Sequence, residues 1–307
     1  MNDTSALLGS PGRLQAPLHA LLAGLIDYAG LFPPAGLGMA ETVRNYAAYQ
    51  RGPEAWALAR LVVPVARLFE FEAALQALPG EDRTGARFPV TALLGTDPAA
   101  DLAAVCTFNE RQGPAGPHIL SLEGRVSVPD HVARLRAAVP DEFELYCELP
   151  LSADLTGLVC QVEAVGAAAK VRTGGLTPAD IPAPEAVLSF LAACATEGVP
   201  FKATAGLHHA MRAERALTTA PDGARAIQFG YLNVVLAATV LWHERPLEEA
   251  FRLLTLEASA PLQVEEQRLV WGGLVISRDE IVEARQEFIR AIGACSFTEP
   301  LAEAPGA

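Results

Sequence analysis

Lysine is scarce in this sequence of 307 residues: among 23 lysine and arginine residues, Lys170 and Lys202 are the two lysines. Arginine stays protonated inside proteins, whereas a lysine amine gives up its proton where its surroundings require it. A neutral amine is a nucleophile that forms a Schiff base with a carbonyl compound. We therefore expect the two lysines to be functional, against the alternative that they only reflect an arginine-biased composition.

Other features that the sequence lacks exclude whole classes of protein. A net charge of -13 leaves no basic face for nucleic acid or for an anionic membrane. The longest mostly apolar stretch, residues 234–242, is too short to cross a bilayer, and residues 1–5 carry no basic segment of a secretory signal. The five cysteines are scattered and form no Cys-x-x-Cys pair, which predicts reduced thiols in the cytoplasm and no zinc site.

A regular alternation of short apolar runs and amphipathic segments is what the sequence does contain. The runs are residues 22–28, 59–63, 88–94, 118–122, 143–147, 167–171, 199–203 and 226–230. Helical patterns separate them, for example at 39–50, 130–139 and 184–198. Eight such units predict an α/β fold, a (β/α)8 TIM barrel over residues 1–260. The alternative is a doubly wound sheet, but no Gly-x-Gly-x-x-Gly follows the first run.

The pattern changes in residues 261–307, which we expect to be a C-terminal hairpin-helix extension. Residues 262–269 and 274–276 predict a hairpin that turns at Trp271-Gly272-Gly273. The spacing of Ser277 and Glu280 predicts a capping box at the start of a helix, and residues 295–307 are expected to be extended. This extension is expected to cover one end of the barrel or to contact a second subunit of a homo-oligomer.

Polar residues gather where the predicted strands end, which is the active-site face of such barrels. They are Asp27, Glu123, Glu148, Lys170, Arg172, Lys202, His208 and His209. The lysines occupy equivalent places on adjacent strands about 4.8 Å apart, so their amines should lie within about 8 Å of each other. Like charge and desolvation then favour losing the proton of one amine.

The segments around the two lysines resemble signatures of the deoxyribose-phosphate aldolases. Lys-Val-Arg-Thr-Gly-Gly at 170–175 resembles Lys-Thr-Ser-Thr-Gly on that family's sixth strand, and Lys-Ala-Thr-Ala-Gly-Leu at 202–207 resembles Lys-Pro-Ala-Gly-Gly-Val on its seventh. The resemblance implies that Lys170 forms the Schiff base and that Lys202 tunes it. Glu148 is similar to a glutamate that closes strand five in that family.

The sequence departs from the aldolase pattern at the family's phosphate site. That family ends strand eight with Gly-Thr-Ser-Ser, whereas residues 229–233 here read Phe-Gly-Tyr-Leu-Asn. His208 and His209 replace the arginine and threonine that follow the family's strand-seven glycines. We therefore expect a small carbonyl substrate that is not phosphorylated.

The polar residues at this face are given two groups of roles. Lys170, Lys202, Glu148 and Glu123 are the expected catalytic residues, while Asp27, Arg172, Gly174, Gly206, His208, His209 and Asn233 are expected to bind substrate. Glu123 and Glu148 either transfer protons or form ion pairs, and Asp27 either orients a lysine or caps its loop. Arg172 is suited to hold a substrate carboxylate.

The function expected from these residues is a class I aldolase-type lyase without a cofactor or a metal. One alternative is a metal-assisted barrel enzyme using Glu123, Glu148, His208 and His209, although adjacent histidines rarely aim both rings at one ion. The other alternative is a barrel without catalytic activity that binds a small ligand.

Overall fold

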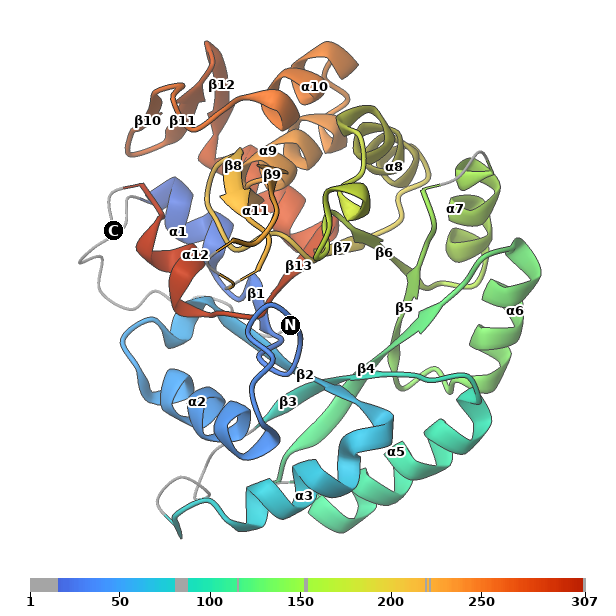
Figure 1. The fold of residues 1–307 in the computed structure, drawn as a ribbon. Helices are drawn as coiled ribbons and strands as arrows, with labels where there is room; N and C mark the ends of the chain where they lie inside the picture. The colour runs from blue at the N-terminus through green and yellow to red at the C-terminus, as the bar shows by residue number, and fades with distance from the viewer. Residues whose placement is uncertain are drawn as a thin grey trace.

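Parallel strands close into an eight-stranded barrel in the computed structural model, which describes residues 16–80, 88–114, 116–151, 154–218, 220 and 222–305 (Figure 1). Around the barrel the strands follow the order β1 (Ile26–Tyr28), β13 (Ile289–Ala294), β7 (Phe201–Thr204), β6 (Ala168–Arg172), β5 (Glu144–Glu148), β4 (His118–Arg125), β3 (Pro89–Leu93) and β2 (Leu58–Pro64). The expected α/β fold, a (β/α)8 TIM barrel, is confirmed.

Helices follow the strands and form a ring around them (Figure 1). They are α1 (Ala16–Leu22), α2 (Met39–Arg51), α3 (Leu68–Gln76), α5 (Pro98–Gln112), α6 (Pro129–Ala138), α7 (Leu155–Ala164) and α8 (Pro184–Thr196), with short 3₁₀ turns η2 (Ala55–Ala57), η3 (Val65–Arg67) and η4 (Pro178–Asp180). In α5, Asp97 accepts a hydrogen bond from the N–H of Ala100 and Pro98 opens the first turn. A proline also opens the first turn of α6 and α8, so the sequence marks the start of these three helices.

The eighth barrel strand is not the segment that the sequence pattern suggests. The predicted strand at 226–230 corresponds to β9 (Arg225–Gln228), which pairs antiparallel with β8 (Ala213–Ala216) in a separate hairpin. The strand β13 closes the barrel between β1 and β7 instead. Parallel barrel strands are buried on both faces, and β13 is buried over most of its length, whereas β9 alternates between exposed and covered residues.

The expected boundary at residue 260 is therefore wrong, because β13 lies beyond it and completes the barrel. Between β9 and β13 the chain forms α9 (Tyr231–Trp242), α10 (Leu247–Thr255), the antiparallel strands β10 (Leu262–Val264), β11 (Arg268–Trp271) and β12 (Leu274–Ser277), and α11 (Arg278–Glu287). The hairpin at Trp271 and the capping box of Ser277 and Glu280 are confirmed. The final segment is not wholly extended, because α12 (Thr298–Ala302) lies within it.

Helix α9 forms the densest part of the core outside the barrel. Its residues from Tyr231 to Leu241 are all buried, and α8, α10 and α11 contact it. A helix that is apolar on every side is stable only when neighbours cover all of it. Within the part of the chain that is described, no helix has the length and apolar character needed to span a membrane.

Candidate active site

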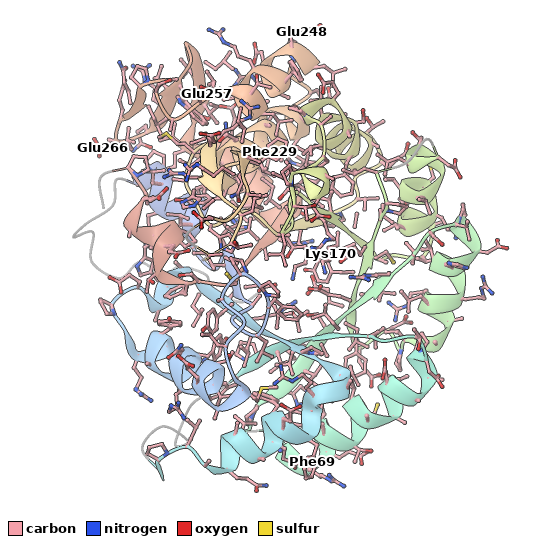
Figure 2. All side chains as sticks on the ribbon, in the orientation of Figure 1. Phe69, Lys170, Phe229, Glu248, Glu257 and Glu266 are labelled. Atoms are coloured by element: carbon pink, nitrogen blue, oxygen red, sulfur yellow. The ribbon has the colours of Figure 1, made fainter. Side chains whose placement is uncertain are left out.

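The two lysines lie side by side inside the barrel. Lys170 on β6 is directly paired in register with Lys202 on β7, and only 4% and 1% of their surfaces are exposed. Figure 2 shows Lys170 within the ring of strands. Ala169 pairs with Phe201 and Val171 with Ala203 on either side of them, so the two lysines lie on neighbouring strands at the same depth in the barrel.

A single carboxylate binds both amines. Glu123 on β4 accepts a hydrogen bond from Lys170 Nζ at 2.5 Å on Oε2 and one from Lys202 Nζ at 2.5 Å on Oε1. The Glu123 side chain is itself buried, with 3% of its surface exposed. Because each amine bonds to one oxygen of the same carboxyl group, the closeness expected of the two amines is confirmed.

The network extends from these three residues in both directions. Lys202 also donates to Oδ2 of Asp27 on β1, while Lys170 Nζ lies 2.7 Å from Oε2 of Glu148 on β5. The other oxygen of Glu148 accepts a hydrogen bond at 3.1 Å from Nε of Arg125, whose side chain is 82% exposed. Charges of opposite sign thus alternate along six side chains, from the buried Asp27 to the surface.

The network fixes the protonation of its central members. Burial alone would raise the pKa of Glu123, but the charges of Lys202 and Lys170 outweigh burial and hold it at about 2. Burial would likewise lower the pKa of Lys202, yet the charges of Asp27 and Glu123 raise it well above its usual value. At neutral pH, Glu123 is therefore a carboxylate and Lys202 an ammonium.

A second polar layer supports the network from below. Nζ of Lys202 lies 5.2 Å from the ring centroid of Tyr146, whose hydroxyl donates to Glu144 at 2.8 Å. Arg60 binds the other oxygen of Glu144 at 2.5 Å and donates its backbone N–H to Asp27 at 2.9 Å. None of these three residues, Arg60, Glu144 and Tyr146, was expected at the site from the sequence. Glu144, Tyr146 and Glu148 occupy every second position of β5 and therefore share one face of the strand. This spacing is a signal that could have identified Glu144 and Tyr146.

A cavity of about 520 Å³ opens above the lysines at the carboxyl ends of the strands. Lys170, Lys202, Glu123 and Glu148 line it, together with loop residues that include Phe32, Arg172, Gly206, His208 and Cys295. Ala216 and Gln228, from the β8–β9 hairpin, line it as well. A volume of this size is typical of sites that bind small molecules.

A second cavity, of about 700 Å³, adjoins the first and is also lined by Lys170. Its lining includes the β3–α5 loop and the side chains of His131 and Arg134 on α6. Lys170, Glu123, Glu148 and Arg125 line both cavities. Lys170 thus borders both cavities.

The glycines expected at the site shape the loops after β6 and β7. Gly206 has a φ of +78°, and Ala205 before it has a φ of +68°, a conformation that is uncommon for a residue with a Cβ. Thr173 donates to the carbonyl of Ala205 at 2.7 Å. A Cβ on Gly174 would lie 3.1 Å from Cα of Gly206, so the two turns touch backbone to backbone.

The two histidines line the first cavity but point to different partners. His208 lies beside the thiol of Cys295, with Nδ1 3.6 Å from Sγ, and burial lowers its pKa to about 4. His209 Nδ1 lies 2.8 Å from Glu303. No three His, Cys, Asp or Glu side chains of the described residues are grouped to hold a metal ion. The arrangement expected for a metal-assisted enzyme is therefore not formed, because Glu123 and Glu148 bind lysines instead.

Asn233 lies apart from the site, contrary to the sequence-based expectation. It belongs to α9, is completely buried, and donates to the carbonyls of Leu253 at 2.6 Å and Leu256 at 2.8 Å. Its own oxygen accepts the N–H of Arg212 at 2.8 Å. The prediction failed because it assumed a barrel strand just before this residue. Asp27, by contrast, binds Lys202 directly.

Comparison with known proteins adds no family to this description: neither a protein-family model nor a curated protein matches the chain. Of what the resemblance to deoxyribose-phosphate aldolases implies, the structure shows the barrel of parallel strands with alternating helices, and it assigns no family.

Proposed function

We propose that this protein is a class I aldolase-type lyase in which Lys170 forms a Schiff base with a small carbonyl compound. The observation that carries the proposal is the pair of buried lysines on one carboxylate, open to a cavity of substrate size. Buried charges are costly to maintain, so a barrel that keeps two lysines inside it has a use for them.

Lys170 is the better nucleophile of the two. Lys202 is held by Asp27 and Glu123, both about as buried as itself, and its raised pKa keeps it charged. Lys170 lines both cavities, and its second carboxylate partner, Glu148, has 11% of its side chain exposed and leads to Arg125 at the surface. A proton that leaves Lys170 therefore has an acceptor that reaches solvent.

The chemistry follows from these contacts. Glu148 takes the ammonium proton of Lys170, and the free amine adds to the carbonyl carbon. The oxygen leaves as water after receiving one proton from the attacking nitrogen and one back from Glu148, which leaves a protonated imine. In the cleavage direction, a carboxylate removes the proton of the β-hydroxyl, the Cα–Cβ bond breaks, and its electron pair moves to the imine nitrogen as an enamine forms. Lys202 stays protonated and keeps Glu123 in place throughout.

The two cavities suit a reaction that makes or breaks a carbon–carbon bond. Such a reaction has one fragment attached to the lysine and a second fragment that leaves or arrives. Because Lys170 lines both cavities, each fragment can occupy one of them. A barrel that only binds a ligand needs one cavity and no nucleophile at its wall.

Reductive trapping tests the proposal. Borohydride added together with aldehydes and ketones should leave a covalent mass increase on the peptide containing Lys170. Lys170→Arg should abolish it, because guanidinium keeps the charge but forms no imine. The matched control is Lys202→Arg, which should leave the label on Lys170 if the variant folds. Labelling of Lys202 alone would reverse the assignment, and no labelling by a broad panel would favour the alternative of a binding barrel.

A further inference from the structure

Arg172 faces the reaction site from the same strand as Lys170. It lies two residues later on β6, and alternate residues of a strand point to the same side. Their Cα atoms are thus about 6.6 Å apart, and both side chains line the cavity of about 520 Å³. Arg172 therefore lies at the wall of the cavity, nearer the carboxyl end of β6 than Lys170.

The charge of Arg172 is not neutralised by direct contact with the described part of the protein. It forms no hydrogen bond or ion pair with another described residue, whereas Arg125, the other arginine of this cavity, binds Glu148. The carboxylate of Asp180 is close enough for an electrostatic interaction with Arg172, but its hydrogen bonds go to Thr177, from the backbone N–H at 2.8 Å and from the hydroxyl at 2.9 Å. With respect to the described residues, the donors of Arg172 are therefore available to a ligand.

The chemistry of a guanidinium selects the ligand. Its planar fork binds a carboxylate through two parallel hydrogen bonds. The same cavity is lined by the acidic side chains of Asp180 and Glu299, which would repel a phosphate dianion more strongly than a carboxylate with one charge. An arginine that no described side chain binds through a hydrogen bond, beside these acids, suits a ligand with a single negative charge.

We propose that the substrate is an oxo acid, an aldehyde or ketone whose carboxylate lies a few bonds from the carbonyl group and binds Arg172 while the carbonyl carbon meets Lys170. This inference rests on the proposed function, and it adds the substrate class. The structure of the site thus separates two tasks along β6, with the nucleophile deeper in the barrel and the anchor nearer the surface.

Trapping rates with matched carbonyl compounds test the inference. Pyruvate and 4-oxopentanoate are compared with the neutral ketones acetone and 2-pentanone, and dihydroxyacetone phosphate with dihydroxyacetone. Borohydride labelling of Lys170 should be more efficient with the oxo acids. Arg172→Gln should reduce that efficiency by about tenfold or more with the better oxo acid and change it less than twofold with the ketones. Arg44→Gln, on the exposed side of α2, is the control and should alter neither.

The outcomes separate this inference from the proposed function. If Lys170 is labelled equally well by oxo acids and ketones, and Arg172→Gln changes neither, the oxo-acid inference is overturned while the proposed Schiff base remains. Dependence on Arg172 for dihydroxyacetone phosphate but not for the oxo acids also overturns it. No labelling of Lys170 by any compound overturns the proposed function and this inference with it. Partial recovery of oxo-acid labelling in Arg172→Lys supports the inference, because lysine keeps the charge without the fork.

Discussion

At the scale of single residues, the site is governed by the pairing of buried charges. Asp27, Lys202, Glu123 and Lys170 are all nearly inaccessible, and each contacts a neighbour of opposite sign. Removing one partner from such a pair leaves an uncompensated charge in a region of low dielectric constant. The stability of the barrel and the protonation of the proposed nucleophile therefore depend on the same contacts.

Lys202→Met should destabilise the protein by roughly 3–5 kcal/mol, because it leaves Asp27 and Glu123 buried without their shared cation. Urea unfolding followed by circular dichroism measures the change. The double variant Asp27→Asn/Lys202→Met also removes the buried negative charge of Asp27, whereas Glu123 keeps its contact with Lys170. Part of the lost stability should therefore return. If Lys202→Met unfolds at the same urea concentration as the wild type, the ion pairs contribute nothing to stability and this description of the network is wrong.

Acid should remove the stabilising contribution of Glu123. Its folded pKa of about 2 lies below the ordinary value of 4.5, so this contribution is fully present above pH 4.5 and is lost as the pH falls towards 2. Wild type and Glu123→Gln should therefore differ most in unfolding free energy at pH 7, by an amount on the order of 3 kcal/mol, and least near pH 2.5. Urea titrations at pH 7, 4.5 and 2.5 give the comparison. A difference that stays constant over this range would contradict the low pKa.

The residues of this network could be predicted from the sequence to different degrees. Lys170 and Lys202 stand out because lysine is otherwise absent, and Glu123 and Glu148 because each ends an apolar run. Arg60 carries no such signal, since charged residues are common near the start of a strand, and for Glu144 the only signal is the spacing that it shares with Tyr146 and Glu148 on β5. Their pairing depends on the register between β2 and its neighbours around the barrel, which only the folded structure defines.

At the scale of secondary structure, seven of the eight barrel strands could be predicted from the sequence, and β13 could not. Seven barrel strands lie where short apolar runs suggest them, since each run is bounded by turn residues. The eighth follows α11 with no glycine or proline between them: Phe288 ends the helix and β13 begins at Ile289. A helix that passes directly into a buried strand leaves no local mark in the sequence.

A fragment of residues 1–260 should not fold, although the apolar pattern alone suggests a complete barrel there. It lacks β13, so β1 and β7 would each present an unpaired edge and the barrel would stay open. We expect the purified fragment to aggregate or to unfold without a cooperative thermal transition, while the full chain unfolds cooperatively. Addition of a peptide covering residues 261–307 is the matched test, because it supplies the missing strand. A cooperative transition in the fragment alone would show that β13 is dispensable.

At the scale of the whole molecule, the barrel provides rigidity and the connecting segments provide the cavity. The lysines and carboxylates come from strands β1 and β4 to β7, which hold them at fixed separations. The walls come from the loops and from the β8–β9 hairpin, where sequence patterns are weakest. The buried polar residues of the site could thus be predicted from the strands, whereas the shape of the cavity depends on how the loops are placed.

The reactivity of the five cysteines tests the packing of the helices around the barrel, because the thiols range from exposed to buried. Cys160 on α7 is exposed and Cys106 on α5 is partly covered, whereas Cys147 on β5 and Cys194 on α8 are buried. Burial also raises the pKa of Cys147 to about 12, which removes the reactive thiolate at neutral pH. We expect a thiol reagent to modify Cys160 first, and to reach Cys147 and Cys194 at a rate lower by a factor on the order of 10³ or more, set by global unfolding. Mass mapping of each peptide over time gives the order, with Cys160→Ser as the control that removes the fast phase. Equal rates for Cys160 and Cys194 in the native protein would mean that α8 does not cover the barrel as described.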